Sequence, residues 1–441
     1  MKGAIAAGHP VTAEAGASVL ARGGNAVDAC IAAAFAAFVT EGPLTGPAGG
    51  GFFLAHSEGA TTLLDCFFAV PTRTLGRIEE LTVDFGSMTQ SYHVGDGSVA
   101  VPGLLAGLTE AHDRFGQLEW AELVSPAIEL AHTGVEVSSA QAFLHEILRA
   151  VLQRDEGGRR IYGNVERLDT VDLAVTLERI RDDPAAAVRE LVPELEADLD
   201  AYLPIELAPL HASVGGRDVL TTPAPSRGGA VVASALEGFA RSHSLHDRAT
   251  ALRSAYGGDS YGGITGTTHI SVVDAAGTAA GLSSTLGAGS GVHRGGTQLN
   301  NMLGEFDVIG RGKLHPRERL ASMMTPTLVL EDGRPRLVLG SAGSVRLAGA
   351  IAQVAAAVLD GASVSEAIER PRIHVVGERD LHLEGGFSHE ETATLPEGAW
   401  NVIPWQSLNL YFGGASAVEL RPDGTLDAAG DSRRGGHGIV V

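Results

Sequence analysis

The hydrophobic and polar positions at the start of the chain follow a helical period. They predict a helix that begins at Thr12, as its N-cap, and runs to about Arg22. A break at Gly23-Gly24-Asn25 separates it from a second helix, rich in alanine, that ends near Val39. Residues 46–51, Gly-Pro-Ala-Gly-Gly-Gly, then predict a loop that leads into a buried strand. The first fifty residues therefore predict a helix, a second helix that is buried, and the start of a sheet.

The pattern changes twice further along the chain. Residues 104–210 are dominated by helical periodicity, and the portion from 154 to 200 is charged and more exposed. From Gly266 onward, short β-branched runs alternate with turn signals, and one strong helix covers residues 346–359. Neither a linker nor an internal repeat divides the chain. The sequence predicts an α+β protein in which helices and sheets share one core.

A hairpin is predicted where the strand-rich part begins. Residues 268–273 and 279–286 are strand-like runs joined by a turn at 274–278. If the turn is centred near Ala276, Thr267 lies opposite Thr285, with Cβ atoms roughly 4.5–5.5 Å apart. A register error of one residue would turn Thr285 to the other face.

A second hairpin is predicted from residues 327–330 and 337–339, turning at Asp332-Gly333. It ends in Gly340-Ser341-Ala342-Gly343-Ser344, a glycine-rich turn that opens the predicted helix at 346. Backbone N–H groups of such a turn can converge on an anion, which an oxyanion hole requires. The alternative is a tight turn that only joins sheet to helix.

Composition and charge narrow the possible functions. The formal net charge of the 441 residues is -21, and no run of Lys and Arg is present to hold nucleic acid. Cys30 and Cys66 lie in apolar surroundings and predict two buried thiols. No histidine pair has the spacing of a catalytic zinc site, so we expect neither metal nor cofactor. The N-terminus has no sustained apolar stretch and the run 30–39 is too short for a bilayer, so we expect a cytoplasmic protein without a membrane span.

Residues 267–274, Thr-Thr-His-Ile-Ser-Val-Val-Asp, resemble the strand that opens the small subunit of γ-glutamyltranspeptidases. The resemblance runs nearly from end to end, with matches at 23–29, 49–52, 101–103, 299–301, 322–323, 326–327 and 431–436. It implies the four-layer αββα sandwich of the N-terminal nucleophile hydrolases, matured by cleavage between Gly266 and Thr267. Residues 1–266 and 267–441 would then be the two fragments of one domain. They would form a heterodimer, with further oligomerisation possible, that acts on a small molecule.

The same resemblance implies a role for each matching residue. Thr267 would be the nucleophile in both self-cleavage and turnover, and its freed α-amino group the general base, since α-amino groups titrate near neutrality. Thr285 would hydrogen-bond and orient the nucleophile. The backbone N–H groups of Gly343 and Ser344 would stabilise the oxyanion, and a serine in place of the family's second glycine changes little there.

The carboxylate clamp of the family is absent. Its arginine follows a Leu-Asp-Phe motif, whereas this chain has Leu64-Asp65-Cys66-Phe67. Because a guanidinium binds a carboxylate with two parallel hydrogen bonds, Phe67 in its place favours an apolar or aromatic portion of the substrate. The alternative is that Phe67 only packs in the core and another arginine binds the carboxylate.

The matches around the substrate amino group are mixed. Glu305 stands where the family has an aspartate and is an expected amino-group ligand, although a lone glutamate is more often a solvated surface residue. Met302 and Gly287 replace polar ligands of the family, and Ala321 replaces the first of two serines. The residues expected to bind substrate are Phe67, Asn301, Glu305 and Ser322.

Other motifs compete with this interpretation. Residues 258–262, Gly-Asp-Ser-Tyr-Gly, match a serine nucleophile elbow, but a predicted strand follows them rather than the required helix. Residues 287–291 have neither the spacing nor the helix of a nucleotide-binding loop. We therefore expect a self-processing hydrolase or acyltransferase that acts on an amino-acid-derived acyl group other than ordinary γ-glutamyl, with glutathione not favoured. Two alternatives stay open, a carbon–carbon bond hydrolase with the same nucleophile and an uncleaved binding protein without activity.

Overall fold

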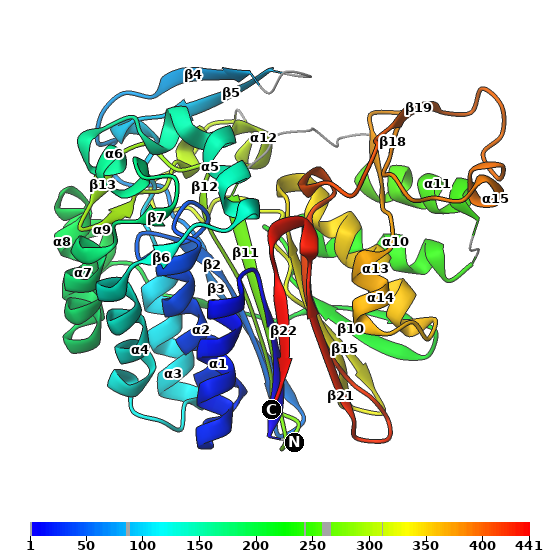
Figure 1. Cartoon of the computed structure of the whole chain (residues 1–441), viewed down its shortest axis with the longest axis horizontal. Helices are drawn as coiled ribbons and strands as arrows, with labels where there is room; N and C mark the ends of the chain where they lie inside the picture. Colours follow the sequence, from blue (N-terminus) through cyan, green and yellow to red (C-terminus); the bar gives the residue numbers. More distant parts are fainter. Residues whose placement is uncertain (1, 85–88, 242–243, 258–265, 311) are drawn as a thin grey trace.

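The computed structural model describes residues 2–84, 89–241, 244–257, 266–310 and 312–441. Two β-sheets pack face to face in the middle of the molecule, and a layer of helices covers the outer face of each sheet (Figure 1). This arrangement confirms the predicted four-layer αββα sandwich. The two chain ends lie close together at one edge of the molecule (Figure 1).

The first sheet has seven strands within the described residues. Its strand order is β22 (His437–Val440), β1 (Gly3–Ala7), β11 (Gly266–Asp274), β12 (Ala279–Gly287), β2 (Gly50–Ser57), β3 (Ala60–Cys66) and β8 (Ile205–Leu207). Every residue of β11 and β12 is buried, because these strands lie between a helical layer and the other sheet. A strand covered on both faces needs no alternation of polar and apolar residues. The predicted hairpin at 268–286 is thus the centre of the core.

The second sheet has six strands in the part of the chain that is described. Its strand order is β21 (Leu426–Gly430), β20 (Gly414–Leu420), β16 (Arg334–Ala342), β15 (Thr327–Glu331), β10 (Arg217–Thr221) and β9 (Leu210–Val214). The hairpin predicted from residues 327–339 is β15 and β16. Strand β16 packs against β11 across the two sheets, which places its end beside Thr267.

One helical layer packs on the first sheet. It includes α1 (Pro10–Arg22), α2 (Ala26–Thr40), α3 (Leu104–Phe115), α4 (Trp120–Thr133) and α7 (Val171–Asp182). The predicted cap of α1 is wrong: His9 caps it, and Thr12 lies inside the helix, where its hydroxyl donates to Glu41 Oε1 at 2.9 Å. Pro10 suits the first helical position because the N–H that it lacks has no acceptor there.

The other helical layer packs on the second sheet. It consists of α10 (Gly228–Phe239), α11 (Leu245–Tyr256), α13 (Leu347–Leu359) and α14 (Val364–Glu369). Helix α13 confirms the helix predicted at 346–359, and it is buried along most of its length. It begins directly after η4 (Ser344–Arg346), which contains the predicted oxyanion residue Ser344.

Shorter elements surround the sandwich. They are β4 (Glu79–Asp84), β5 (Thr89–Val94), η1 (Asp96–Ser98), β6 (Val135–Glu136), α5 (Ser139–Leu152), α6 (Glu156–Tyr162), β7 (Arg167–Leu168), α8 (Pro184–Leu191), η2 (Pro193–Leu195), α9 (Glu196–Asp200), β13 (His293–Arg294), β14 (Thr297–Gln298), η3 (Met302–Gly304), α12 (Phe306–Ile309), β17 (Ile373–Val376), β18 (Asp380–Leu383), α15 (His389–Thr392), β19 (Asn401–Pro404), η5 (Leu410–Phe412) and η6 (Ser432–Arg434). The helices from α3 to α9 confirm the helical region predicted from residues 104–210. Both cysteines are free and buried, as predicted. In the described ranges, every helix is too short or too polar to cross a bilayer.

Candidate active site

Thr267 lies at an irregularity in the central hairpin. The predicted register holds at Thr268, opposite Ser284, and at His269, opposite Ser283. Between Gly266 and Thr268 the ladder shifts by one residue, so Thr267 stands opposite two residues of β12, Thr285 and Leu286, and the regular pair predicted with Thr285 is replaced by a β-bulge. A β-bulge of this kind turns side chains away from the regular ladder, and bulges are frequent beside active sites.

The hydroxyl of Thr285 contacts the bond at which cleavage is predicted. It donates a hydrogen bond to the carbonyl oxygen of Gly266 and accepts one from the Gly287 N–H at 2.9 Å. Thr285 was predicted to hydrogen-bond the Thr267 hydroxyl and orient it. In the structure its hydroxyl instead bonds to these two backbone groups. A donor on the Gly266 carbonyl stabilises negative charge that develops there when a nucleophile attacks.

Thr267 lines a small pocket together with most of the predicted site residues. The side chain of Thr267 is only 4% exposed. The pocket has about 30 Å³ of space for the centre of a water molecule, which is room for about two waters. Besides Thr267, its lining consists of Phe67, Thr285, Gly287, Met302, Glu305, Val308, Ser322, Met323, Met324, Ser344 and Leu347. Of the predicted residues, Gly266, Gly343 and Asn301 stand outside this lining.

The predicted oxyanion turn has an unusual backbone. Strand β16 ends at Ala342, and Gly343 follows with φ 129°; a Cβ there would lie 2.9 Å from the Cα of Gly413, so only glycine fits. Ser344 has φ 55°, in the left-handed region, where a non-glycine residue is strained by about 1 kcal/mol. As the first residue of η4, its N–H has no acceptor within that turn. This geometry suits an oxyanion hole better than a plain connection between sheet and helix.

Glu305 and Asn301 hold the backbone beside the nucleophile. The Ala288 N–H donates to Asn301 Oδ1 at 2.8 Å and to Glu305 Oε1 at 2.9 Å. A Cβ on Gly287 would lie 2.1 Å from Asn301 Oδ1, and its φ is 70°, which explains the glycine there. Glu305 is 8% exposed, so the interpretation as a surface carboxylate is wrong. Burial raises the pKa of Glu305 to about 7.

Phe67 is at once a core residue and a wall of the pocket. Its ring stacks on Phe52 at 5.6 Å and meets Phe68 edge-on at 4.9 Å. Among the described residues that line the pocket, none is an arginine. Arg319 donates to the Phe67 carbonyl at 3.4 Å, but its guanidinium lies over the Tyr202 ring at 3.9 Å and outside the lining.

His269 of the Thr-Thr-His motif is structural. Its ring lies between the hydroxyls of Ser283, at 2.8 Å, and Ser271, at 2.9 Å. Burial lowers its pKa to about 3, so the ring is neutral at physiological pH. A Cβ on Gly340 would lie 2.3 Å from Nδ1 of the ring, so this glycine lets the second sheet approach the histidine.

Sequence reasoning missed a buried carboxyl next to the nucleophile. Glu41 Oε2 accepts a hydrogen bond from the Thr268 hydroxyl at 2.5 Å, and burial raises the pKa of Glu41. Glu41 and Arg434 both line a small cavity on which Thr267 and Thr268 also border. A single glutamate after a helix carries no sequence signal that would have identified it.

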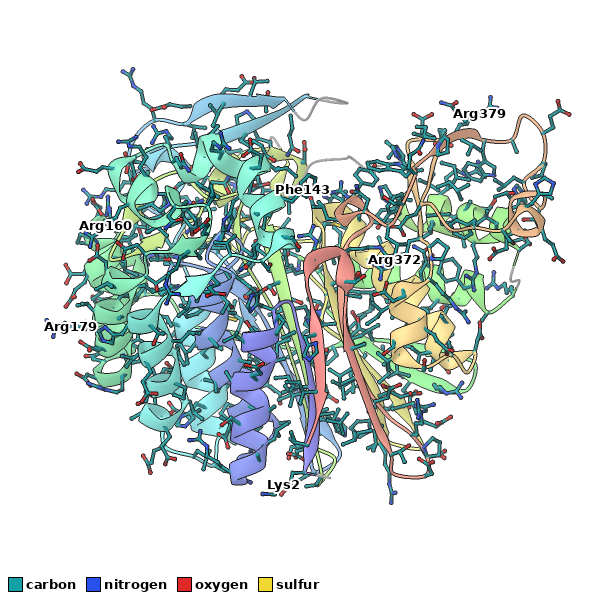
Figure 2. All side chains as sticks on the ribbon, viewed as in Figure 1. Lys2, Phe143, Arg160, Arg179, Arg372 and Arg379 are labelled. Atoms are coloured by element: carbon teal, nitrogen blue, oxygen red, sulfur yellow. The ribbon has the colours of Figure 1, made fainter. Side chains whose placement is uncertain are left out.

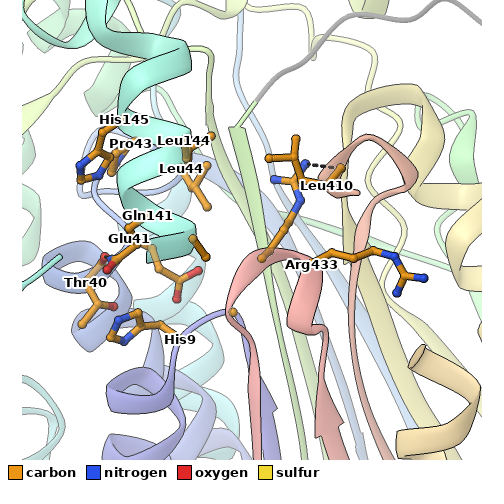
Figure 3. A pocket seen from close by; sticks show the side chains of 13 residues that line it. His9, Thr40, Glu41, Pro43, Leu44, Gln141, Leu144, His145, Leu410 and Arg433 are labelled. Carbon is orange, nitrogen blue, oxygen red and sulfur yellow. Dashed lines mark hydrogen bonds between the residues drawn. The ribbon is translucent and has the colours of Figure 1, made fainter. Parts of the chain in front are cut away.

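This cavity adjoins a groove between the two halves of the molecule. Figure 3 shows His9, Glu41, Gln141 and His145 on one side of the groove and Leu410 across it. The hydrogen bond drawn to Leu410 is donated by Arg434 Nη2 to the Leu410 carbonyl at 3.4 Å.

The motif at 431–436 is explained by buried ion pairs. Asp431 pairs with Arg372 at 2.6 Å and with Arg433 at 3.1 Å, and Arg433 pairs with Glu384 at 2.7 Å. Burial alone would raise the pKa of Asp431, but the two guanidiniums hold this pKa below its ordinary value. Figure 2 shows Arg372 inside the fold, whereas Arg160, Arg179 and Arg379 lie at the periphery. The network fixes the turn that carries Arg434.

The serine-elbow motif at 258–262 lies outside the described residues. In the ranges that are described, no group of three or more His, Cys, Asp or Glu side chains is arranged to hold a metal ion.

Comparison with known proteins identifies the family. The model of the gamma-glutamyltranspeptidase family matches residues 12–259 and 240–441. The chain belongs to this family. It is therefore a hydrolase or transferase by family, and its fold is that of the N-terminal nucleophile hydrolases.

The similar proteins include acylases and glutathione hydrolases. The acylase ACY 1 proenzyme of Pseudomonas sp. (strain V22) is 28% identical over all of this chain and 94% of its own length. The glutathione hydrolase proenzyme of Escherichia coli (strain K12) is 27% identical over 98% of this chain and 90% of its own. The crystal structure of cephalosporin acylase from Bacillus halodurans matches with a TM-score of 0.84 at 21% identity, covering 99% of this chain and 95% of the other.

Proposed function

We propose that this protein cuts itself before Thr267 and then uses Thr267 as the nucleophile of an amide hydrolase or acyltransferase. The observation that carries the proposal is the contact at Gly266. The Gly266 carbonyl accepts a hydrogen bond from the Thr285 hydroxyl. The next residue, Thr267, lines a pocket that Ser344 also lines. Similarity to proteins named as proenzymes supports the same conclusion.

Self-cleavage begins with attack of the Thr267 Oγ on the Gly266 carbonyl carbon. The hydroxyl proton passes to the Thr267 nitrogen as the C–N bond breaks, which converts the peptide into an ester and frees the α-amino group. Water then hydrolyses the ester and leaves fragments 1–266 and 267–441. The Thr285 hydroxyl stabilises the tetrahedral intermediate at the Gly266 oxygen. The two fragments stay together as a heterodimer because β11 lies in the middle of the seven-stranded sheet.

Turnover uses the amino group that cleavage frees. This amine takes the proton from Oγ of Thr267, and Oγ attacks the acyl carbon of the substrate. The N–H groups of Gly343 and Ser344 stabilise the oxyanion. The leaving amine receives the proton, and water or a second amine then releases the acyl group from Thr267.

The pocket supports an acyl group that differs from ordinary γ-glutamyl. Its walls are mostly apolar, and Phe67 stands where the family's clamping arginine would be. Glu305 is the carboxyl available for a substrate ammonium, and Ser322 is a hydroxyl on the same pocket. An amino-acid-derived acyl group with an apolar portion fits this lining better than glutathione does. A cytoplasmic location stays a prediction.

Denaturing gel electrophoresis and mass spectrometry test the proposal. The purified protein is expected to give two fragments from the 45.4 kDa precursor. After incubation with γ-glutamyl-p-nitroanilide or a simple aromatic acyl-p-nitroanilide, the added acyl mass is expected on the fragment that begins with Thr267. A protein that stays whole under these conditions would be a binding homologue, and the proposal would be wrong. An adduct on any other residue would also overturn it.

A further inference from the structure

A second space borders Thr267 besides the nucleophile pocket. It is the small cavity whose polar lining includes Glu41, Thr268 and Arg434, and it is called the Glu41 cavity below. Of the described residues that line either space, only Thr267 lines both. The nucleophile therefore stands between two spaces, and the proposed turnover uses only the pocket.

The Glu41 cavity has room for one water molecule. It offers about 20 Å³ for the centre of a water, and a single molecule needs about 10–15 Å³. Gly8 keeps this space open, since a Cβ there would lie 2.3 Å from Glu41 Oε2 and 2.7 Å from Thr268 Oγ. An amino acid is several times too large for the cavity, so it suits water rather than a substrate or an acceptor amine.

The lining offers the polar partners that a buried water needs. Glu41 Oε2 accepts the Thr268 hydroxyl at 2.5 Å and Oε1 accepts the Thr12 hydroxyl at 2.9 Å, and each carboxylate oxygen can accept a further hydrogen bond. Arg434 Nε is buried and has no hydrogen-bond partner among the described residues. Such an orphaned donor is rare in a folded protein and points to a bound water.

Water can reach this cavity without passing the nucleophile pocket. Gly8, Glu41, Leu44 and Arg434 line both the Glu41 cavity and the groove seen in Figure 3. The two spaces are therefore continuous along these residues. A substrate that fills the nucleophile pocket would leave this second route open.

The bond that self-cleavage has to hydrolyse lies at the same place. A Cβ on Gly266 would lie 3.0 Å from the Pro43 oxygen and 3.2 Å from the Leu44 Cα, and Leu44 lines the Glu41 cavity. Thr267, whose hydroxyl carries the ester in the proposed self-cleavage, lines the cavity as well. The ester between Gly266 and Thr267 thus forms at the wall of a space that suits one water.

We propose that the Glu41 cavity holds the water that hydrolyses this ester and that Glu41 is the general base for the step. The inference rests on the proposed function and assigns one step of its self-cleavage. The water oxygen attacks the Gly266 carbonyl carbon as one proton of the water passes to Glu41. The bond from this carbon to Thr267 Oγ then breaks, Oγ takes the proton from Glu41, and Gly266 is left as the new carboxyl end.

The surroundings of Glu41 suit a base. Burial raises the pKa of Glu41, whereas the hydroxyls of Thr268 and Thr12 and the charge of Arg434 act to lower it. These three groups stabilise the ionised form, which is the form that accepts a proton. A carboxylate whose pKa is raised accepts a proton from water more readily than a surface carboxylate does.

Glu41→Gln tests the base. Glutamine keeps the size of the side chain but cannot take the proton, so freshly made precursor is expected to cut itself about a hundredfold more slowly on gel electrophoresis. Glu14→Gln removes an exposed carboxylate from α1 and is expected to cut itself at the wild-type rate. Thr268→Val keeps the carboxyl but removes a hydroxyl that holds it, and is expected to slow cleavage about tenfold.

Hydroxylamine separates a lost base from a lost structure. This small nucleophile attacks esters without the help of a base and leaves ordinary peptide bonds intact at neutral pH. It is expected to speed the cleavage of Glu41→Gln at least about tenfold and to leave a hydroxamate on Gly266 in place of the carboxyl, which mass spectrometry detects. Thr267→Ala cannot form the ester and is expected to stay whole in hydroxylamine.

The outcomes distinguish this step from the proposed function. Cleavage of Glu41→Gln at the wild-type rate, or slow cleavage that hydroxylamine does not speed, overturns the role of Glu41, while the proposed function stands if wild type cuts itself before Thr267. If wild type stays whole with and without hydroxylamine, the proposed function fails and the role of Glu41 with it. Circular dichroism checks that each variant is folded, and if Glu41→Gln is not, the same two outcomes for Thr268→Val decide.

Discussion

Replacing Glu305 by glutamine is expected to change how stability depends on pH. Burial raises the pKa of this carboxyl from 4.5 to about 7, so the folded protein binds its proton more tightly than the unfolded chain does. The stabilisation that the protonated Glu305 gives the folded state is therefore complete below about pH 4.5 and is lost as pH rises through about 7. At about 1.4 kcal/mol for each pKa unit, the ionised form costs the folded state about 3 kcal/mol.

Glutamine removes the ionisation and keeps the local contacts. Its side-chain oxygen can accept the Ala288 N–H that Glu305 now accepts at 2.9 Å. Relative to wild type, Glu305→Gln is therefore expected to gain about 3 kcal/mol of unfolding free energy between about pH 4.5 and pH 8. Other titrating groups, Glu41 included, are the same in both proteins and cancel in the comparison.

Urea unfolding at a series of pH values measures this difference. Both proteins carry Thr267→Ala, so that each is expected to remain a single polypeptide, and Glu318→Gln is the control at an exposed carboxylate. A difference between Glu305→Gln and wild type that stays constant over this pH range would refute the reasoning. It would mean that Glu305 is solvated and ionised in the folded protein, contrary to its 8% exposure.

Three further substitutions test separate parts of the site. Thr285→Val removes the donor to the Gly266 carbonyl and is expected to slow self-cleavage about tenfold to a hundredfold, whereas Thr285→Ser is expected to stay near wild type. Gel electrophoresis of freshly made precursor measures the rate of cleavage, and equal rates in Thr285→Val and wild type would contradict the role of the hydroxyl. Ser344→Gly relieves the left-handed backbone at φ 55° and is expected to raise the unfolding free energy by about 1 kcal/mol in urea, whereas a loss would show that the serine side chain is stabilising. Phe67→Arg, compared with Phe67→Leu, is expected to raise the hydrolysis of γ-glutamyl-p-nitroanilide, and no gain in a folded variant would count against the specificity argument.

The periodic parts of the fold could be predicted from the sequence. The helices at 10–22, 26–40 and 347–359 follow from apolar spacing and breaks at glycine, because local pattern decides where such helices form. The central hairpin and its register at Thr268 and His269 follow from the length of the turn. The prediction of the layered arrangement rested on the resemblance to a family, since hydrophobic periodicity does not specify which sheet packs against which.

The details of the site depend on contacts between distant segments. The β-bulge opposite Thr267 forms where the backbone of Leu286 bonds to Leu44 and Asn301, and no local pattern predicts it. Helix α1 begins at Pro10 with His9 as its cap, and the hydroxyl of Thr12 is instead engaged by Glu41, 29 residues further on. Tertiary packing decided each of these features.

N-terminal sequencing of the purified, active protein is the most direct test of the account. The account predicts two chains, one of which begins Thr-Thr-His-Ile-Ser at residue 267, and predicts that Thr267→Ala yields one uncut and inactive chain. Finding active protein without a chain that begins at residue 267, or normal cleavage in Thr267→Ala, would contradict it.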